Sequence, residues 1–147
     1  MADDSFGYMD FFKLRRTPFS AAIPPEELYQ SPQMQECLSR LRFAAELNKF
    51  AVLTGPVGTG KSTTLHAFNN SLNPNRYLVL YVSESNLTPR WLYSVPLKQM
   101  KIKARFFVNE SKRQFNEALI EEVRQHGRKI VLIIDEAHLM FSKRHGR

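Results

Sequence analysis

Three apolar runs of strand length divide the chain, at residues 50–53, 77–82 and 130–134. The second and third are nearly continuous in apolar residues, which is typical of parallel strands covered by helices on both faces. The first is long enough for one more buried strand. The pattern therefore predicts an α/β fold with a parallel sheet.

Helical spacing predicts two helices around the first run. The earlier one has Ser31 as its N-cap and Pro32 as its first residue, and it should end around Asn48. The later one begins near Lys61 and stops before Asn73. Both present one apolar face toward a core.

Two more helices are predicted between the second and third runs. One follows Thr88 and Pro89, and Pro96 should kink it or end it early. The other covers residues 110–126 and ends at Gly127, a favourable C-terminal residue. The chain therefore divides into an aromatic, proline-rich arm over residues 1–30, expected to pack on the domain, and one domain over residues 31–147.

The glycine-rich stretch after the first run carries the clearest chemistry. Residues 55–62 read GPVGTGKS, which is G-x-x-x-x-G-K-[ST] with a strand predicted before it and a helix after it. Glycines let the backbone approach a phosphate closely and adopt positive φ. Lys61 is expected to reach the β- and γ-phosphates of ATP and Ser62 to ligate Mg²⁺. The predicted phosphate contacts are Gly55, Pro56, Val57, Gly58, Thr59, Gly60, Lys61, Ser62 and Thr63; the alternative is an ordinary glycine-rich turn.

A pair of acidic residues follows the third run. Asp135 and Glu136 lie where ligands bind in an open parallel sheet, beyond the carboxyl ends of the strands. Asp135 is expected to complete the Mg²⁺ site opened by Ser62, and Glu136 to act as the general base that activates water. His138 completes the letters DEAH, but no other helicase motif accompanies them, so a polar role beside the site is the preferred interpretation.

Charge and composition limit the partners and the cellular location that are expected for this chain. The formal net charge is +7, which favours polyanionic partners, although many basic proteins bind none. The basic residues of 98–105 are interpreted first as a solvated loop and second as a phosphate-backbone contact. No secretory signal and no apolar run of membrane-spanning length are seen, and the single cysteine forms no intrachain disulfide. A cytoplasmic protein is therefore expected.

With both motifs placed, the sequence resembles the AAA+ ATPases, and among them the ExeA-like group. Within that group it is similar to the ATPase helpers of bacterial transposons, which have a role like that of MuB and TnsC. The resemblance covers most of the chain to about residue 140. The stretches that carry it are DFFKLRRTPFS, IPPEELYQSPQMQECLSRLRFAAE, FAVLTGPVGTGKSTT, YLVLYVSESNLTPRWLY and KIVLIIDEAHL.

The resemblance implies a three-layer P-loop fold that uses ATP and Mg²⁺. It implies an ATP-dependent, DNA-binding target-selection helper, with double-stranded DNA and a transposase as partners and a possible homo-oligomer. Adenine is expected near residues 29–32. Family members continue through a sensor strand, an arginine finger and a helical lid, so the chain is expected to be truncated, with a gap in the sheet and slow or lost hydrolysis. The gap is expected either to close by direct pairing of the first and third strands or to leave the chain poorly folded.

Three other functions stay open. The first is a nucleotide- or DNA-binding remnant without turnover, the second is an ExeA-like secretion ATPase, and the third is a small-molecule kinase. The carboxylate of Glu136 argues against a kinase, which has no use for a group that activates water.

Overall fold

The computed structural model describes residues 7–15, 17, 27, 29–83 and 88–138. The helices and strands follow in the order α1 (Tyr8–Phe11), α2 (Pro32–Glu46), α3 (Lys61–Ser71), β1 (Tyr77–Val82), α4 (Trp91–Gln99), α5 (Val108–His126) and β2 (Lys129–Ile134). The predicted starts of α2 and α3 and the predicted end of α5 are confirmed. Ser31 caps α2 as expected, because its hydroxyl oxygen accepts a hydrogen bond from Met34 N at 3.2 Å.

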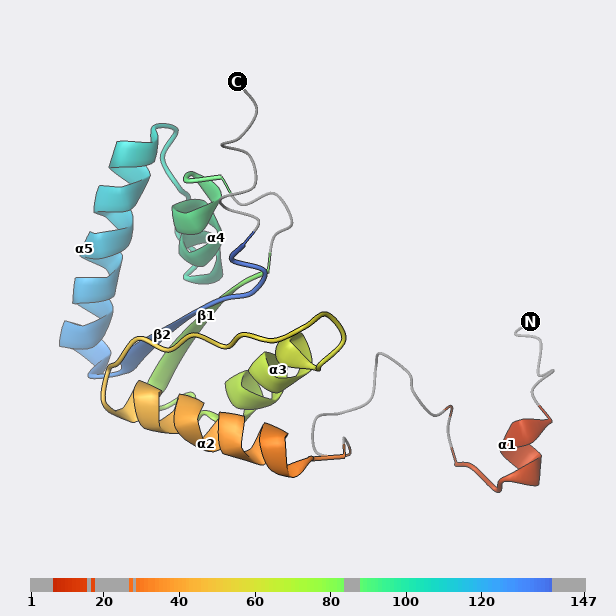
Figure 1. Cartoon of the computed structure of the whole chain (residues 1–147). Coiled ribbons are helices and arrows are strands. Elements are labelled where there is room, and N and C mark those ends of the chain that lie inside the picture. Colours follow the sequence, from red (N-terminus) through yellow and green to blue (C-terminus); the bar gives the residue numbers. More distant parts are fainter. Residues whose placement is uncertain (1–6, 16, 18–26, 28, 84–87, 139–147) are drawn as a thin grey trace.

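The two strands pair in parallel at the centre of the domain. Tyr77 lies opposite Lys129 and Val82 lies opposite Ile134. Helices α2 and α3 cover one face of this sheet, and α4 and α5 cover the other (Figure 1). The predicted three-layer α/β fold with a parallel sheet is therefore confirmed.

Alternation along the strands builds a separate core on each face of the sheet. Ile133 packs with Leu38 and Phe68 on the α2 and α3 side. Leu80 packs with Leu97 and Phe115 on the α4 and α5 side. Because successive side chains of a strand point to opposite faces, one short strand pair supports both helical layers.

The predicted strand at residues 50–53 does not form. Residues 49–56 have no regular secondary structure, and the side chains of Phe50 and Val52 are 92% and 68% exposed. A strand needs a backbone partner, and an apolar run supplies only side chains. Among the described residues β2 pairs with β1 alone, so one of the two outcomes expected for the gap, direct pairing of residues 50–53 with the third strand, does not occur.

Helix α4 continues through Pro96 to Gln99, so its predicted early end is wrong. A proline in a helix removes one backbone donor and crowds the preceding turn. Here the cost is offset by packing, because Pro96 and Leu97 are both fully buried. Burial of this turn against β1 and α5 overrides the local preference.

The N-terminal arm is described only in part. Helix α1 buries no residue, and the rings of Phe11 and Phe12 are exposed and meet edge to face, with centroids 4.9 Å apart. Residues 1–6, 16, 18–26 and 28 lie outside the described residues. The packing of the arm on the domain stays a prediction.

Glu46 ties the end of α2 to the amino ends of both strands. Its carboxylate accepts hydrogen bonds from the Tyr77 hydroxyl at 2.5 Å and from Lys129 Nζ at 2.9 Å. Arg76 Nη2 lies 3.3 Å from the same group. The hydrogen bond from Tyr77 and then the one from Lys129 lower the pKa of Glu46 from 4.5 to about 2.

Candidate nucleotide-binding site

The glycine-rich loop has the backbone geometry that its sequence predicts at two positions. Gly58 and Gly60 have φ angles of +83° and +79°. Gly60 is also the N-cap of α3, in the left-handed conformation. Residues with a side chain rarely adopt these φ angles, so the loop needs glycine at these two positions.

Side chains of the loop are bound to its own carbonyl groups. The Thr59 hydroxyl donates to Pro56 O at 2.9 Å. Lys61 Nζ donates to Gly55 O at 3.0 Å and to Pro56 O at 2.8 Å. The ammonium group therefore lies folded over the loop, held by two neutral acceptors that an anionic phosphate would outcompete.

The first turn of α3 presents backbone donors next to this loop. Thr64 is the first residue whose N–H bonds within the helix, to Gly60 O at 2.8 Å, and its hydroxyl donates to the same oxygen at 2.9 Å. The N–H groups of Lys61, Ser62 and Thr63 precede it and have no intrahelical acceptor. Together with the positive end of the helix dipole they favour an anion.

The acidic pair follows β2 directly. Asp135 is 8% exposed, and its backbone N–H extends the sheet by donating to Val82 O at 2.8 Å. Its Oδ2 accepts from the Tyr81 hydroxyl at 3.1 Å, and its Oδ1 accepts from Glu136 N at 2.9 Å. Burial, and then the charge of Asp135, raise the pKa of Tyr81, so the phenol stays a donor.

Glu136 has an unusual backbone conformation for its type. Its φ angle is +54°, and the left-handed region is costly for a side chain of this kind. Its Oε2 lies 3.2 Å from His138 Nδ1, so the second and fourth residues of the DEAH letters contact each other. The arrangement agrees with the polar role expected for His138 beside Glu136.

One cavity brings the two motifs together. It has a volume of about 820 Å³ and lies between residues 48–55 and the outer edge of β2. Gly55, Lys61, Asp135 and Glu136 all line it, so the loop lysine and the acidic pair border one space. Ser62 is half-buried and does not belong to the lining of this cavity. Residues 29–32 do not belong to it either, and Tyr29 is 86% exposed.

The end of α2 also lines this cavity, which the sequence did not assign to the site. Ala44 and Ala45 of α2, and Asn48 just after it, contribute to its wall beside the apolar side chains of α3 and β2. The sequence signal that could have indicated them is their position in the chain, just before the glycine-rich loop.

The oxygen ligands available near the carboxyl ends of the strands are suitable for magnesium. Mg²⁺ prefers oxygen ligands and usually keeps several waters while it binds one or two carboxylates and substrate phosphates. A serine hydroxyl at Ser62 and the carboxylate of Asp135 are such donors. Among the described residues no group of three or more His, Cys, Asp and Glu side chains gathers as a metal site. The chemistry therefore fits an ion held jointly with a nucleotide rather than by the protein alone.

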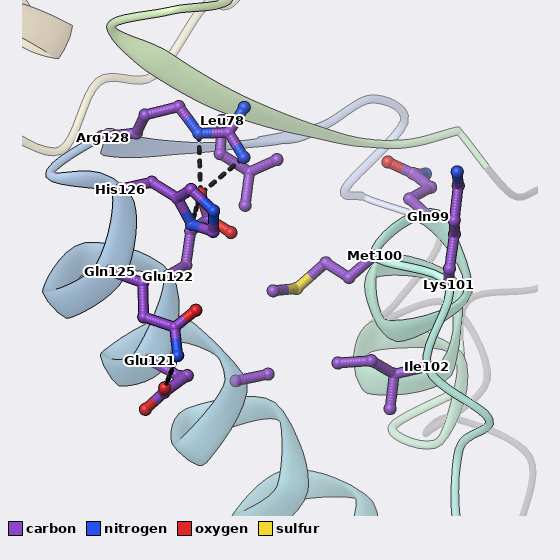
Figure 2. Close-up of a pocket in the computed structure, with 11 residues that line it drawn as sticks. Leu78, Gln99, Met100, Lys101, Ile102, Glu121, Glu122, Gln125, His126 and Arg128 are labelled. Carbon is purple, nitrogen blue, oxygen red and sulfur yellow. Dashed lines mark hydrogen bonds and ion pairs between the residues drawn. The ribbon is translucent and has the colours of Figure 1, made fainter.

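A second, smaller cavity of about 360 Å³ lies between α4 and α5 and reaches Leu78 of β1 (Figure 2). In its wall Glu122 accepts from Arg128 Nε at 2.6 Å and lies 3.3 Å from His126 Nδ1. It is lined by no residue of the glycine-rich loop or of the acidic pair. The larger cavity is therefore the candidate nucleotide site.

Comparison with known families agrees with this geometry. The AAA domain family matches residues 45–146, a range that includes the glycine-rich loop, both strands and the acidic pair. The chain belongs to the AAA domain family. Membership accounts for the parallel sheet between helical layers and shows that this is a nucleotide-binding AAA+ domain.

A curated relative covers nearly the whole chain. General secretion pathway protein A of Aeromonas hydrophila is 31% identical over 142 residues, which is 90% of this chain and 25% of the relative. The chain thus spans about a quarter of the length of that protein. No solved structure gives a significant match. Among the described residues no helix has both the length and the apolar character needed to cross a bilayer.

Proposed function

We propose that this AAA domain binds ATP with Mg²⁺ in the cavity between the glycine-rich loop and β2. The observation that carries the proposal is that Lys61 and Asp135 line one cavity although they come from distant parts of the sequence. Lys61 would exchange its two loop carbonyls for phosphate oxygens. Ser62 and Asp135 would hold the magnesium ion, which neutralises charge on the phosphates when bound.

Hydrolysis is a further part of the proposal. Glu136 is the general base, and its carboxylate would accept a proton from a water molecule aimed at the γ-phosphate. Its place immediately after Asp135 supports this division between metal and water. Steady-state ATP hydrolysis compared with Glu136→Gln tests the role, since the amide keeps the shape and loses the basicity.

Titration with a fluorescent ATP analogue and Mg²⁺ tests nucleotide binding. Lys61→Ala is expected to weaken the affinity roughly tenfold or more, because a charge-assisted contact with phosphate is lost. Lys112→Ala is the matched control, because Lys112 is exposed on α5 and does not line the cavity. Equal affinities for wild type and Lys61→Ala would refute the proposed site.

Two functions are proposed for the nucleotide-bound protein. The first is that of an ATP-dependent helper that binds DNA and acts with a transposase. The support is a basic and aromatic surface, defined as Arg90, Lys103, Arg105, Phe106 and Phe107, in which all five residues are exposed. The Arg90 guanidinium lies 4.9 Å above the ring of Phe106. Gln114 holds the loop in place by accepting from Arg105 N at 3.2 Å and donating to Lys103 O at 3.1 Å. The backbone of residues 103–105 is therefore held against α5.

The second candidate is a secretion ATPase, which the printed name of the Aeromonas hydrophila relative supports. Binding of a labelled DNA duplex at several salt concentrations separates the two. A DNA helper is expected to lose affinity steeply as salt rises, and to lose it further in Lys103→Ala/Arg105→Ala. Arg40→Ala/Arg42→Ala on α2 is the charge-matched control. Equal weakening by both double variants would leave secretion as the favoured function.

A further inference from the structure

Tyr81 joins the acidic pair to the helix that follows the glycine-rich loop. Its side chain lies on the face of the sheet that α2 and α3 cover. Its hydroxyl donates to Asp135 Oδ2 at 3.1 Å. Its ring stacks on His66 of α3, with centroids 4.9 Å apart and planes inclined by 13°. One residue of β1 thus contacts both elements that frame the proposed magnesium site.

These contacts hold the carboxylate of Asp135 at both oxygens. Oδ2 accepts from Tyr81, and Oδ1 accepts from the backbone N–H of Glu136 at 2.9 Å. Each carboxylate oxygen has two lone pairs, so each still has one available for a metal ion or its water. The side chain is also 8% exposed, which leaves it little freedom to turn. The group is held in one orientation before any ligand arrives.

We propose that Tyr81 is a positioning residue for magnesium, acting through Asp135 and supported by His66. This inference rests on the proposed function, because it concerns the same site. Outer partners that orient a metal-binding carboxylate raise metal affinity without touching the metal. The stack on His66 adds a connection to α3, so the carboxylate is fixed relative to the helix that carries Ser62.

The chain offers a matched control four residues earlier on the same strand. The hydroxyl of Tyr77 also donates to a carboxylate, that of Glu46, at 2.5 Å. That pair lies at the amino end of the strands, away from the glycine-rich loop and the acidic pair. Removing either hydroxyl deletes the same kind of hydrogen bond from β1, but only one of the two bonds orients a proposed metal ligand.

The experiment measures how strongly Mg²⁺ improves the affinity for a fluorescent ATP analogue. The ratio of the dissociation constant in EDTA to that in saturating Mg²⁺ is determined for wild type, Tyr81→Phe and Tyr77→Phe. Tyr81→Phe is expected to lower this ratio about tenfold while the affinity in EDTA stays unchanged. Tyr77→Phe is expected to leave both quantities as in wild type. His66→Ala, which removes the stack from an exposed position, is expected to lower the ratio by a smaller factor.

The outcomes separate this inference from the proposed function. If wild type binds the nucleotide and Mg²⁺ improves its affinity equally in wild type and Tyr81→Phe, the positioning role is refuted and the site stands. If wild type shows no nucleotide binding, the proposed function fails, and the positioning role fails with it. Thermal unfolding of both phenylalanine variants is recorded alongside, and a drop in the ratio confined to Tyr81→Phe at similar stability supports positioning.

Discussion

The side-chain amide of Gln99 makes two hydrogen bonds with the backbone of Tyr81. Tyr81 N donates to Oε1 at 2.9 Å, and Nε2 donates to Tyr81 O at 2.5 Å. The amide of α4 thereby satisfies a backbone pair on the outer edge of β1, as a neighbouring strand would. The Gln99 amide thus covers the outer edge of β1 at Tyr81. The outer edge of β2 has no strand partner among the described residues.

Gln99→Leu is expected to lower the free energy of unfolding by about 1–3 kcal/mol, because two backbone groups lose their partners. Urea unfolding followed by circular dichroism measures the change. Gln125→Leu is the control, since the amide of Gln125 bonds only to the exposed side chain of Glu121 in α5. A similar loss for both variants would mean that covering the strand edge has no special weight.

Gly60→Ala and Gly127→Ala are expected to destabilise the domain by similar amounts, about 1–2 kcal/mol each. Both glycines have positive φ, at +79° and +63°, and an added Cβ would meet nothing within 4 Å at either site. The cost is therefore conformational in both. Only Gly60→Ala should also weaken binding of the fluorescent ATP analogue, because only Gly60 belongs to the loop. Parallel unfolding and binding titrations check this, and weakened binding in Gly127→Ala would contradict it.

Acid is expected to release α2 from the sheet through Glu46. Its pKa is 4.5 when unperturbed and about 2 in the fold, so its contribution to stability is present above pH 4.5 and is lost as the pH falls toward 2. The unfolding temperature of wild type should decline across that window more steeply than that of Glu46→Gln, which has no proton to gain. Parallel pH profiles for the two proteins would show that the carboxylate carries no such linkage.

Phe50→Ser is expected to change the free energy of unfolding by less than about 0.5 kcal/mol, because the ring of Phe50 is 92% exposed. Phe68→Ala, in contrast, is expected to cost about 3–5 kcal/mol, since Phe68 is 3% exposed in the core beneath α2. Denaturant unfolding of the two variants compares them directly. A large loss of unfolding free energy in Phe50→Ser would instead support the buried strand that the sequence predicted.

The elements that sequence reasoning found are those whose signals are local. Ser31 before Pro32 marks the start of α2, and Gly127 ends α5 in the left-handed conformation. The continuous apolar runs of β1 and β2 predicted a sheet covered on both faces, and the two cores lie there. The spacing of the glycine-rich loop also predicted the positive φ of Gly58 and Gly60.

The failures concern information that lies elsewhere in the chain. Residues 50–53 have the side chains of a buried strand, but strand formation depends on a backbone partner that an apolar run does not specify. Pro96 has a strong local preference, but burial decides where α4 ends. Likewise the bonds from Tyr81 to Asp135 and from Gln99 to Tyr81 depend on register, and no local pattern indicated them.

The cavity beside β2 has a practical consequence for work with the purified chain. Its walls include Phe50, Val52 and Leu132, whose side chains are exposed, so apolar surface is accessible in the native fold. Dyes such as ANS fluoresce when they bind surface of this kind, and their signal is commonly taken as a sign of a molten globule. For this protein a bright dye signal is expected from the correctly folded domain, and only loss of cooperative unfolding would identify a misfolded preparation.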